Sequence, residues 1–162
     1  MFFLRFLRPT PIASLVDAAP GRKVVIEGRV VAQQTLPLGV AHLACVWYDN
    51  LVETMKAGMR GSRALWFVEK AECRFCGFWV EDTSGSRLWV GGDPREVNVR
   101  GAKRVAGAMN KAATERFTAH VIQPGAVVRV RGVVSAHRSG DPGTGPILRA
   151  TSESPVDIRV RA

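Results

Sequence analysis

This sequence has few of the residues on which enzyme chemistry usually depends. Its 162 residues include three His, three Cys and one Tyr. It contains no Gly-x-Ser-x-Gly nucleophile elbow, no His-Glu-x-x-His zinc motif and no Gly-x-x-x-x-Gly-Lys phosphate loop. No apolar run reaches the roughly 18 residues that a membrane-spanning helix needs. The sequence therefore predicts a protein that is not an enzyme and has no transmembrane span.

Acidic residues are also scarce relative to basic ones. Lys and Arg number 23 against 14 Asp and Glu, which gives a net charge of +9, and 18 of the basic residues are Arg. Arg suits the recognition of phosphate and carboxylate groups, because its planar guanidinium donates hydrogen bonds in pairs. The excess charge indicates either attraction to nucleic acid or an anionic membrane, or a merely solvated surface.

Long helical patterns are absent, and short extended segments dominate. We expect a mainly β fold, either a small barrel of the oligonucleotide/oligosaccharide-binding (OB) type or a sandwich, with about seven strands and one or two short helices. Alternating and β-branched residues predict these strands at 23–32, 41–53, 65–71, in a hairpin at 76–91, and at 126–134, 147–150 and 156–161.

The domain organisation follows from the proline positions and these segments. Residues 1–20 predict an N-terminal arm with a short helix at 12–19, for which Thr10 is a candidate cap. Residues 21–162 predict a single β-barrel domain. An alanine-rich stretch within 102–114 is the one further segment where we expect helix.

Two local signals within the barrel segment are specific. Asp82 to Gly85 has the chemistry of a tight turn, in which the Asp82 carboxylate accepts backbone N–H groups. Gly28 interrupts a strand rich in Val and Ile, and a glycine in that place is typical of a bulge or a sharp barrel bend.

The cysteines form the main candidate for a metal site. Cys73 and Cys76 have Cys-x-x-Cys spacing, and His42 and Cys45 repeat that spacing upstream. The four residues could hold a structural Zn²⁺ tetrahedrally, and this is the only cofactor that the sequence indicates. A redox-active Cys-x-x-Cys and ordinary structural thiols are the alternatives. An odd set of three cysteines favours a reducing compartment, hence a cytoplasmic location.

Strict alternation near the C-terminus predicts a basic strand face. Val128 and Val130 point inward in this pattern, whereas Arg129, Arg131, Arg159 and Arg161 point outward. This face is a candidate nucleic-acid contact. The strand tryptophans could stack on bases or could pack in the core; they are Trp47, Trp66, Trp79 and Trp89.

The N-terminus is apolar with two arginines. Residues 1–8 could touch a membrane interface through Phe2, Phe3, Phe6 and Leu7, which would make the protein peripheral to the inner membrane. Packing on the domain and disorder are the alternatives.

Six short motifs occur in an order that resembles the GIDE ("beside a membrane", BAM) domain of mitochondrial-anchored ubiquitin and SUMO ligases and of bacterial relatives. The similarity extends from about residue 22 to about residue 135. The motifs are Gly28–Val30, Leu36–Leu38, Cys45–Tyr48 with Val52 and Glu53, Gly77–Gly85, Arg116 and Phe117 with Val121–Gly125, and Val128–Gly132.

The resemblance implies a β-rich, barrel-like domain that lies near membranes and binds other proteins. It implies no catalytic residue, because the ligases depend on a RING with eight Cys or His ligands and this sequence has six such residues. We therefore expect a non-enzymatic GIDE-like module with an unidentified protein partner. The alternative is an OB-type protein that binds single-stranded nucleic acid.

Overall fold

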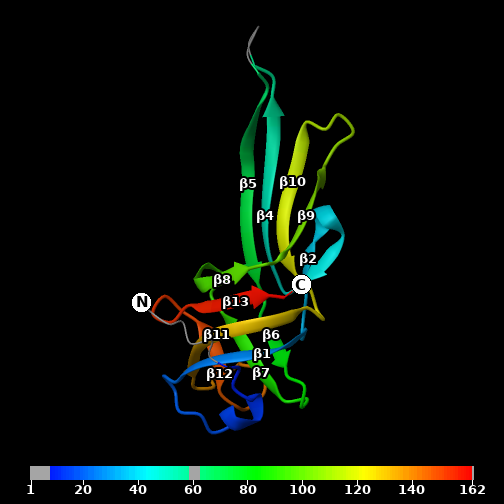
Figure 1. Ribbon diagram of the computed structural model, residues 1–162. Coiled ribbons are helices and arrows are strands. Elements are labelled where there is room, and N and C mark those ends of the chain that lie inside the picture. The colour runs from blue at the N-terminus through cyan, green and yellow to red at the C-terminus, as the bar shows by residue number, and fades with distance from the viewer. Residues whose placement is uncertain (1–7, 59–62, 162) are drawn as a thin grey trace, which may run out of the picture.

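The computed structural model describes residues 8–58 and 63–161, and these residues are almost entirely strands and connecting turns. The predicted mainly β fold is confirmed, and it contains the barrel rather than the sandwich (Figure 1). The described residues form thirteen strands where about seven were expected. The strands are β1 (Lys23–Val31), β2 (Leu36–Leu38), β3 (Leu43–Cys45), β4 (Trp47–Lys56), β5 (Leu65–Phe75), β6 (Phe78–Glu81), β7 (Arg87–Gly92), β8 (Val97–Arg100), β9 (Lys103–Ala108), β10 (Glu115–Ile122), β11 (Val127–Ser135), β12 (Ile147–Ala150) and β13 (Val156–Val160). Three short 3-10 helices are η1 (Ile12–Leu15), η2 (Gly39–Ala41) and η3 (Pro94–Glu96).

Five strands close into the barrel in the order β1-β6-β7-β12-β11, and β1 pairs with both β6 and β11. The β7–β12 pair is parallel, and the other four pairs are antiparallel. This is the strand order of an OB-fold, in which the third and fifth barrel strands run side by side. Along the edge opposite β1, β11 also pairs with β13. β13 in turn pairs with β8, and these two strands extend the sheet beyond the barrel.

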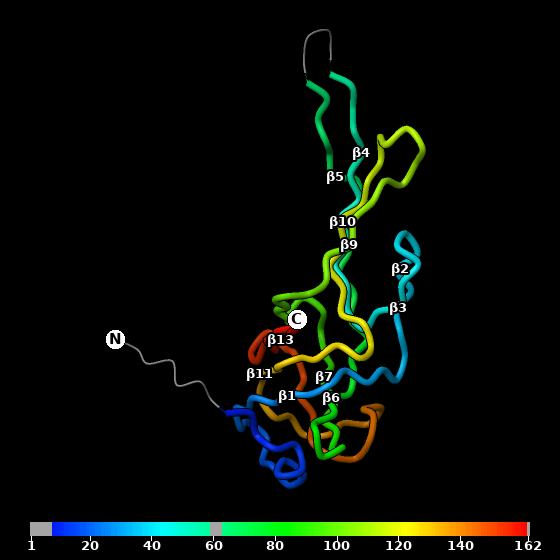
Figure 2. Tube along the Cα trace, turned by 45° about the vertical axis from the view of Figure 1, so that its right-hand side comes forward, coloured from blue at the N-terminus to red at the C-terminus, as the bar shows by residue number. Residues whose placement is uncertain are grey.

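A second sheet stands away from the barrel as an arm made of β4, β5, β9 and β10 (Figures 1 and 2). β4 and β5 come from the chain between β1 and β6, whereas β9 and β10 come from the chain between β7 and β11. The two insertions pair through β4 and β10, so the strand order is β5-β4-β10-β9. The arm is therefore built from two segments that are far apart in the sequence.

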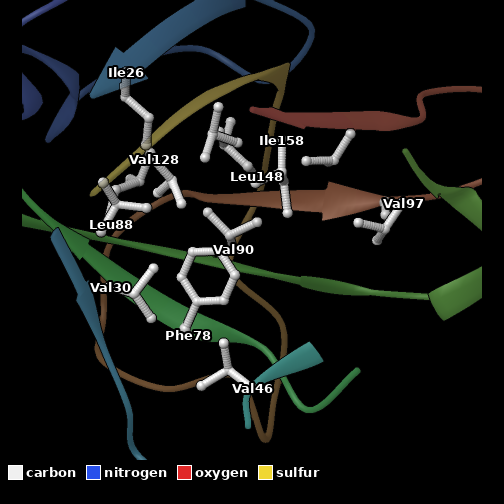
Figure 3. Packing of buried hydrophobic residues seen from close by; sticks show 14 of the residues in the cluster. Ile26, Val30, Val46, Phe78, Leu88, Val90, Val97, Val128, Leu148 and Ile158 are labelled. Carbon is white, nitrogen blue, oxygen red and sulfur yellow. The ribbon is translucent and has the colours of Figure 1, made fainter. Parts of the chain in front are cut away.

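Each sheet has its own hydrophobic core. Inward residues of the barrel strands, joined by Val46 and by Ile12 and Leu15 of η1, form the larger cluster (Figure 3). In the arm, Tyr48, Phe117 and their neighbours pack against Leu38 and Cys45 of the β2–β3 hairpin. The hairpin covers one face of the arm, and the opposite face is open. Alternation within the strands produces this division, because successive side chains point to opposite faces.

Gly28, where the sequence predicts a bulge or a sharp barrel bend, lies at a close approach of two strands. It lies where β1 passes from its pairing with β11 to its pairing with β6. A Cβ at this position would be 2.2 Å from the backbone carbonyl oxygen of Glu81. Since that oxygen belongs to the neighbouring strand, it cannot move without opening the barrel.

We expect Gly28→Ala to destabilise the protein by at least about 1–3 kcal/mol, as overpacking usually does. Gly145→Ala is the matched control, because its backbone is unstrained and no atom of the described residues lies within 4 Å of the added Cβ. The control should change the free energy of unfolding by less than about 0.5 kcal/mol. Urea unfolding of both variants is the measurement, and equal stabilities would contradict this account of the close approach.

The turn prediction is confirmed. Asp82 Oδ1 accepts hydrogen bonds from the backbone N–H groups of Ser84 at 3.0 Å and Ser86 at 3.2 Å. Its Oδ2 accepts a third from Ile12 N at 3.1 Å, which joins η1 to the hairpin. Burial opposes ionisation of Asp82, but the hydrogen bond from the Ser84 hydroxyl at 2.6 Å, together with those from the backbone N–H groups, outweighs it and lowers the pKa of the carboxyl.

The helix expected within 102–114 is wrong. Residues 103–108 form β9, and a turn follows. Local alanine content favours helix, but pairing with β10 places Val105 against the arm core and brings Gly107 against the Phe117 ring, where a Cβ would be 3.1 Å away. Tertiary pairing overrides propensity here.

Other boundaries also differ from the sequence predictions. The segment 41–53 is not one strand, because His42 adopts a left-handed conformation (φ 52°) and the chain bends again between β3 and β4. The strand expected at 65–71 continues to Phe75. The first helix ends at Leu15, and its preceding residue is Pro11 with no side-chain cap, so Thr10 does not cap it. The predicted membrane contact of residues 1–8 lies outside the described residues except for Arg8.

Candidate functional site

The four candidate zinc ligands occupy different surroundings. His42 is exposed after η2, Cys45 is buried in the arm core, and Cys73 is on the open face of β5. Cys76 lies just after β5 and directs its sulfur to the carbonyl oxygens of Gln34 and Val46 at 3.3 and 3.5 Å. Between residues 8 and 161, outside the gap at 59–62, no three His, Cys, Asp or Glu side chains form a group that could hold a metal ion. The zinc site stays a prediction that this arrangement does not support.

All three cysteines are free thiols without an activating environment. Burial is the main cause that raises the pKa of the Cys45 and Cys76 thiols. Partial burial of its sulfur, followed by the nearby Asp49 carboxylate, raises the pKa of Cys73, although much of that residue is exposed. Reactive thiols need a lowered pKa, because the thiolate is the nucleophile. The environment of these thiols favours structural over redox roles.

The open face of the arm contains a polar group that the sequence did not indicate. Asp49 on β4 lies between Cys73 on β5 and His120 on β10. His120 Nδ1 is 2.9 Å from Asp49 Oδ1, and the His120 backbone N–H donates to the same oxygen at 3.0 Å. In a cysteine nucleophile the histidine must lie beside the sulfur. Here the carboxylate separates them, so this arrangement does not activate Cys73.

The structure brings the predicted arginines together and adds one. Arg129 on β11 lies opposite Arg159 on β13, and Arg159 lies opposite Arg100 on β8. Arg131 and Arg161 flank this row on the same outer surface. We call these five residues the arginine face. Arg100 was missed, although Val97 and Val99 alternate with it in the same way as the valines of β11.

Two carboxylates lie within the arginine face. Arg131 Nε is 3.7 Å from Asp157 Oδ2, and Arg161 Nη2 is 3.3 Å from Glu27 Oε2. Glu27, which is on β1, also lies directly opposite Arg129. Five arginines against two carboxylates leave an excess of three positive charges. The outer surface of these strands is therefore cationic, as the alternation predicted.

The tryptophans do not form an open stacking platform. Trp47 is in the barrel core, and Trp66 is on the arm. Trp79 and Trp89 meet edge to face on the outer side of β6 and β7, with ring centroids 5.3 Å apart. The loop at Gly143 lies against Trp79, where a Cβ would be 2.8 Å from the indole. These contacts are those of packed side chains, which is one of the two roles that the sequence allowed.

The distal half of β5 exposes apolar side chains at an edge of the arm sheet. Leu65, Phe67 and Val68 are 60%, 45% and 61% exposed. β5 has β4 on one side and forms the edge of the sheet on the other. The β2–β3 hairpin covers the arm only as far as Val52 and Phe117, nearer the barrel. The end of the arm is thus an apolar edge strand.

Comparison with known proteins identified no matching family model, no similar curated protein and no similar solved structure. In the described part of the chain, no helix has the length and apolar character needed to cross a membrane.

Proposed function

We propose that this protein is a non-enzymatic binding module, and that the distal edge of β5 binds an extended segment of a protein partner as an additional strand. The observation behind the proposal is the exposure of Leu65, Phe67 and Val68 on an edge strand. Strand addition obtains affinity from backbone hydrogen bonds and specificity from alternate side chains. The resemblance of residues 22–135 to the GIDE domain supports a protein partner.

The two edges of the arm differ in how they are protected. Natural sheets protect edge strands with charged residues, because an unprotected edge pairs with other chains. β9 begins with Lys103 and Arg104, and the part of β5 nearest the barrel has a Lys70–Glu72 ion pair at 3.1 Å. The distal half of β5 has mainly apolar residues at its exposed positions. This contrast favours the distal half of β5 as the binding edge.

Cationic groups beside the apolar residues suggest the chemistry of the partner. Lys56 Nζ lies 5.2 Å from the ring centroid of Phe67, and Arg63 lies two residues before the first residue of β5. On the other face, Arg116 stacks on Trp66 at 3.8 Å and is already paired with Glu53. An extended segment with apolar residues at alternate positions and an acidic residue near Lys56 would match this edge.

The proposal includes a location in the cytoplasm at the surface of the inner membrane. Three free thiols suit a reducing compartment. The GIDE resemblance implies proximity to a membrane, and residues 1–8 are the segment that the sequence suggests for the contact.

Selection of a phage-displayed random peptide library on the full chain tests the binding edge. We expect selected peptides to have alternating apolar residues and to bind Val68→Asp about tenfold more weakly than the wild-type protein. Val16→Asp is the matched control, because Val16 is 67% exposed after η1, outside the arm. That variant should bind the peptides as the wild-type protein does.

Hydrogen exchange of the peptide complex locates the contact. We expect slower exchange of the β5 amides, since the added strand would hydrogen-bond to them. Failure to select peptides, equal loss in the two Asp variants, or protection confined to the barrel would overturn the proposal.

A further inference from the structure

The arginine face presents like charges side by side across three strands. Arg129, Arg159 and Arg100 occupy directly opposite positions in β11, β13 and β8. Adjacent strands lie about 4.8 Å apart, so the three guanidinium groups begin from closely spaced backbone positions. Like charges directly opposite each other destabilise a sheet. The neighbouring Arg159 and Arg100 therefore form an unfavourable contact that an anionic ligand would relieve.

The carboxylates nearby lie at one end of the row and on its flanks. Glu27 forms an ion pair with Arg161, and Asp157 forms one with Arg131. Glu27 also lies opposite Arg129, at one end of the row. Within residues 8–58 and 63–161, Arg159 and Arg100 form no ion pair. Both are exposed. The middle and the far end of the row are therefore available to a ligand.

The shape of the donors identifies the chemistry of that ligand. A guanidinium group donates two parallel hydrogen bonds to the oxygens of a phosphate group. Several arginines on one surface fit a chain of phosphates better than a single phosphate ion. The net charge of +9 would also attract a polyanion from a distance.

The lack of stacking groups distinguishes duplex from single-stranded nucleic acid. The residues that alternate with the core at the paired positions of β1, β11, β13 and β8 are Lys23, Val25, Glu27, Arg29, Val127, Arg129, Arg131, Val133, Asp157, Arg159, Asn98 and Arg100. None of these is aromatic, whereas proteins that bind single strands stack the bases on aromatic rings. A duplex hides its bases and offers about one phosphate charge per 1.7 Å of its axis.

We infer that the arginine face binds the phosphate backbone of duplex nucleic acid without reading its bases. The contact would be electrostatic and independent of base sequence. It is separate from the proposed protein contact, because the arginine face lies on β8, β11 and β13 and the apolar edge lies on the arm. The barrel would thus bind the duplex on the outer surface of β11, β13 and β8.

Fluorescence anisotropy with a labelled DNA duplex of about 20 base pairs, at about 50 and 200 mM salt, tests this inference. The variant is Arg100→Gln with Arg159→Gln. Its matched control is Arg63→Gln with Lys111→Gln, which removes the same charge from exposed positions on the arm. We expect the first variant to lose about tenfold or more in affinity and to show a salt slope smaller by about 2, one per lost phosphate contact.

The control variant should lose less than about threefold, since it changes only the long-range field. Thermal unfolding must show that the Arg100/Arg159 variant is folded, and relief of like-charge repulsion should leave its stability equal or higher. Unlabelled single-stranded DNA and inorganic polyphosphate serve as competitors, and both should compete less well than duplex. No binding at the lower salt, equal losses in both variants, tighter binding of either competitor, or binding only to anionic lipid vesicles would overturn the inference.

Discussion

Truncation of Phe78 to Ala is expected to lower the free energy of unfolding by about 3–5 kcal/mol. Phe78 on β6 is fully buried and lies among Val30, Val46 and Val90 at the centre of the barrel cluster (Figure 3). Its ring also meets Phe75 edge to face, with centroids 6.0 Å apart. Since the barrel strands enclose this position, the neighbouring side chains cannot collapse into the space that the ring leaves.

Phe67→Ala is the control for this substitution. It removes the same atoms from a side chain that is 45% exposed on the arm, and we expect a change of less than about 1 kcal/mol. Urea unfolding followed by tryptophan fluorescence measures both, with the slope against denaturant unchanged. A loss as large for Phe67 as for Phe78 would show that the barrel interior is not the main source of stability.

Removal of Asp141 is expected to cost a similar amount, about 3–5 kcal/mol, because it leaves the Arg149 guanidinium buried without its partner. The Asp141 side chain is only 11% exposed and that of Arg149 only 16%. Arg149 donates a short hydrogen bond to Asp141 Oδ2. Asp141 also accepts the backbone N–H of Arg138 at 2.7 Å, and its own carbonyl oxygen is 2.9 Å from His137 Nε2. The pair therefore fastens the loop between β11 and β12 to the barrel.

A double-mutant cycle separates the interaction between Asp141 and Arg149 from the effect of substituting each residue alone. Asp141→Ala alone should be strongly destabilising, whereas Asp141→Ala combined with Arg149→Met should recover much of the loss, since no unpaired charge is then buried. Arg95→Ala is the surface control, because it breaks the exposed ion pair with Asp93 and should have little effect. Additive losses in the double variant would contradict the role of the pair.

The stability difference between the wild-type protein and Asp141→Asn should depend on pH. Burial opposes ionisation of Asp141, but the hydrogen bond from Arg149 and that from Arg138 outweigh it and lower the pKa of the carboxyl. Because the folded pKa is lowered, the ionised carboxylate contributes stability above the unfolded pKa of about 3.9, and this contribution is lost as pH falls through the folded value. Urea unfolding at about pH 7 and about pH 3 should show a smaller difference at the acidic pH.

Both proposed binding surfaces, the distal edge of β5 and the arginine face, lie away from β6 and β7, because packed side chains occupy the outer side of these two strands. In OB-folds those two strands commonly form part of the ligand face. Here Trp79 and Trp89 pack against each other on that side, and Gly143 lies on Trp79. The two insertions, β4 with β5 and β9 with β10, instead form the arm, and β13 and β8 extend the barrel sheet next to β11. New surfaces have thus been added to the barrel at the positions where our two proposals place binding.

Features that depend on nearby residues could be determined from the sequence alone. The hairpin of β6 and β7 was predicted because Asp82 closes its turn through residues within four positions. The alternation of valine and arginine in β11 identified both the barrel interior and the cationic side, because strand side chains alternate strictly. Gly28 was identified as a structurally constrained position from its place among β-branched residues.

Only the tertiary structure decided which strands lie together. Residues 47–54 of β4 pair with residues 115–122 of β10, and no local pattern specifies a partner at that distance. Pairing with the other edge of β10 turned the alanine-rich segment after residue 102 into β9, and the parallel pairing of β13 with β8 placed Arg100 beside Arg159. A sequence specifies the faces of each strand through local alternation, whereas the neighbours of each strand follow from the closure of the barrel and the burial of both cores.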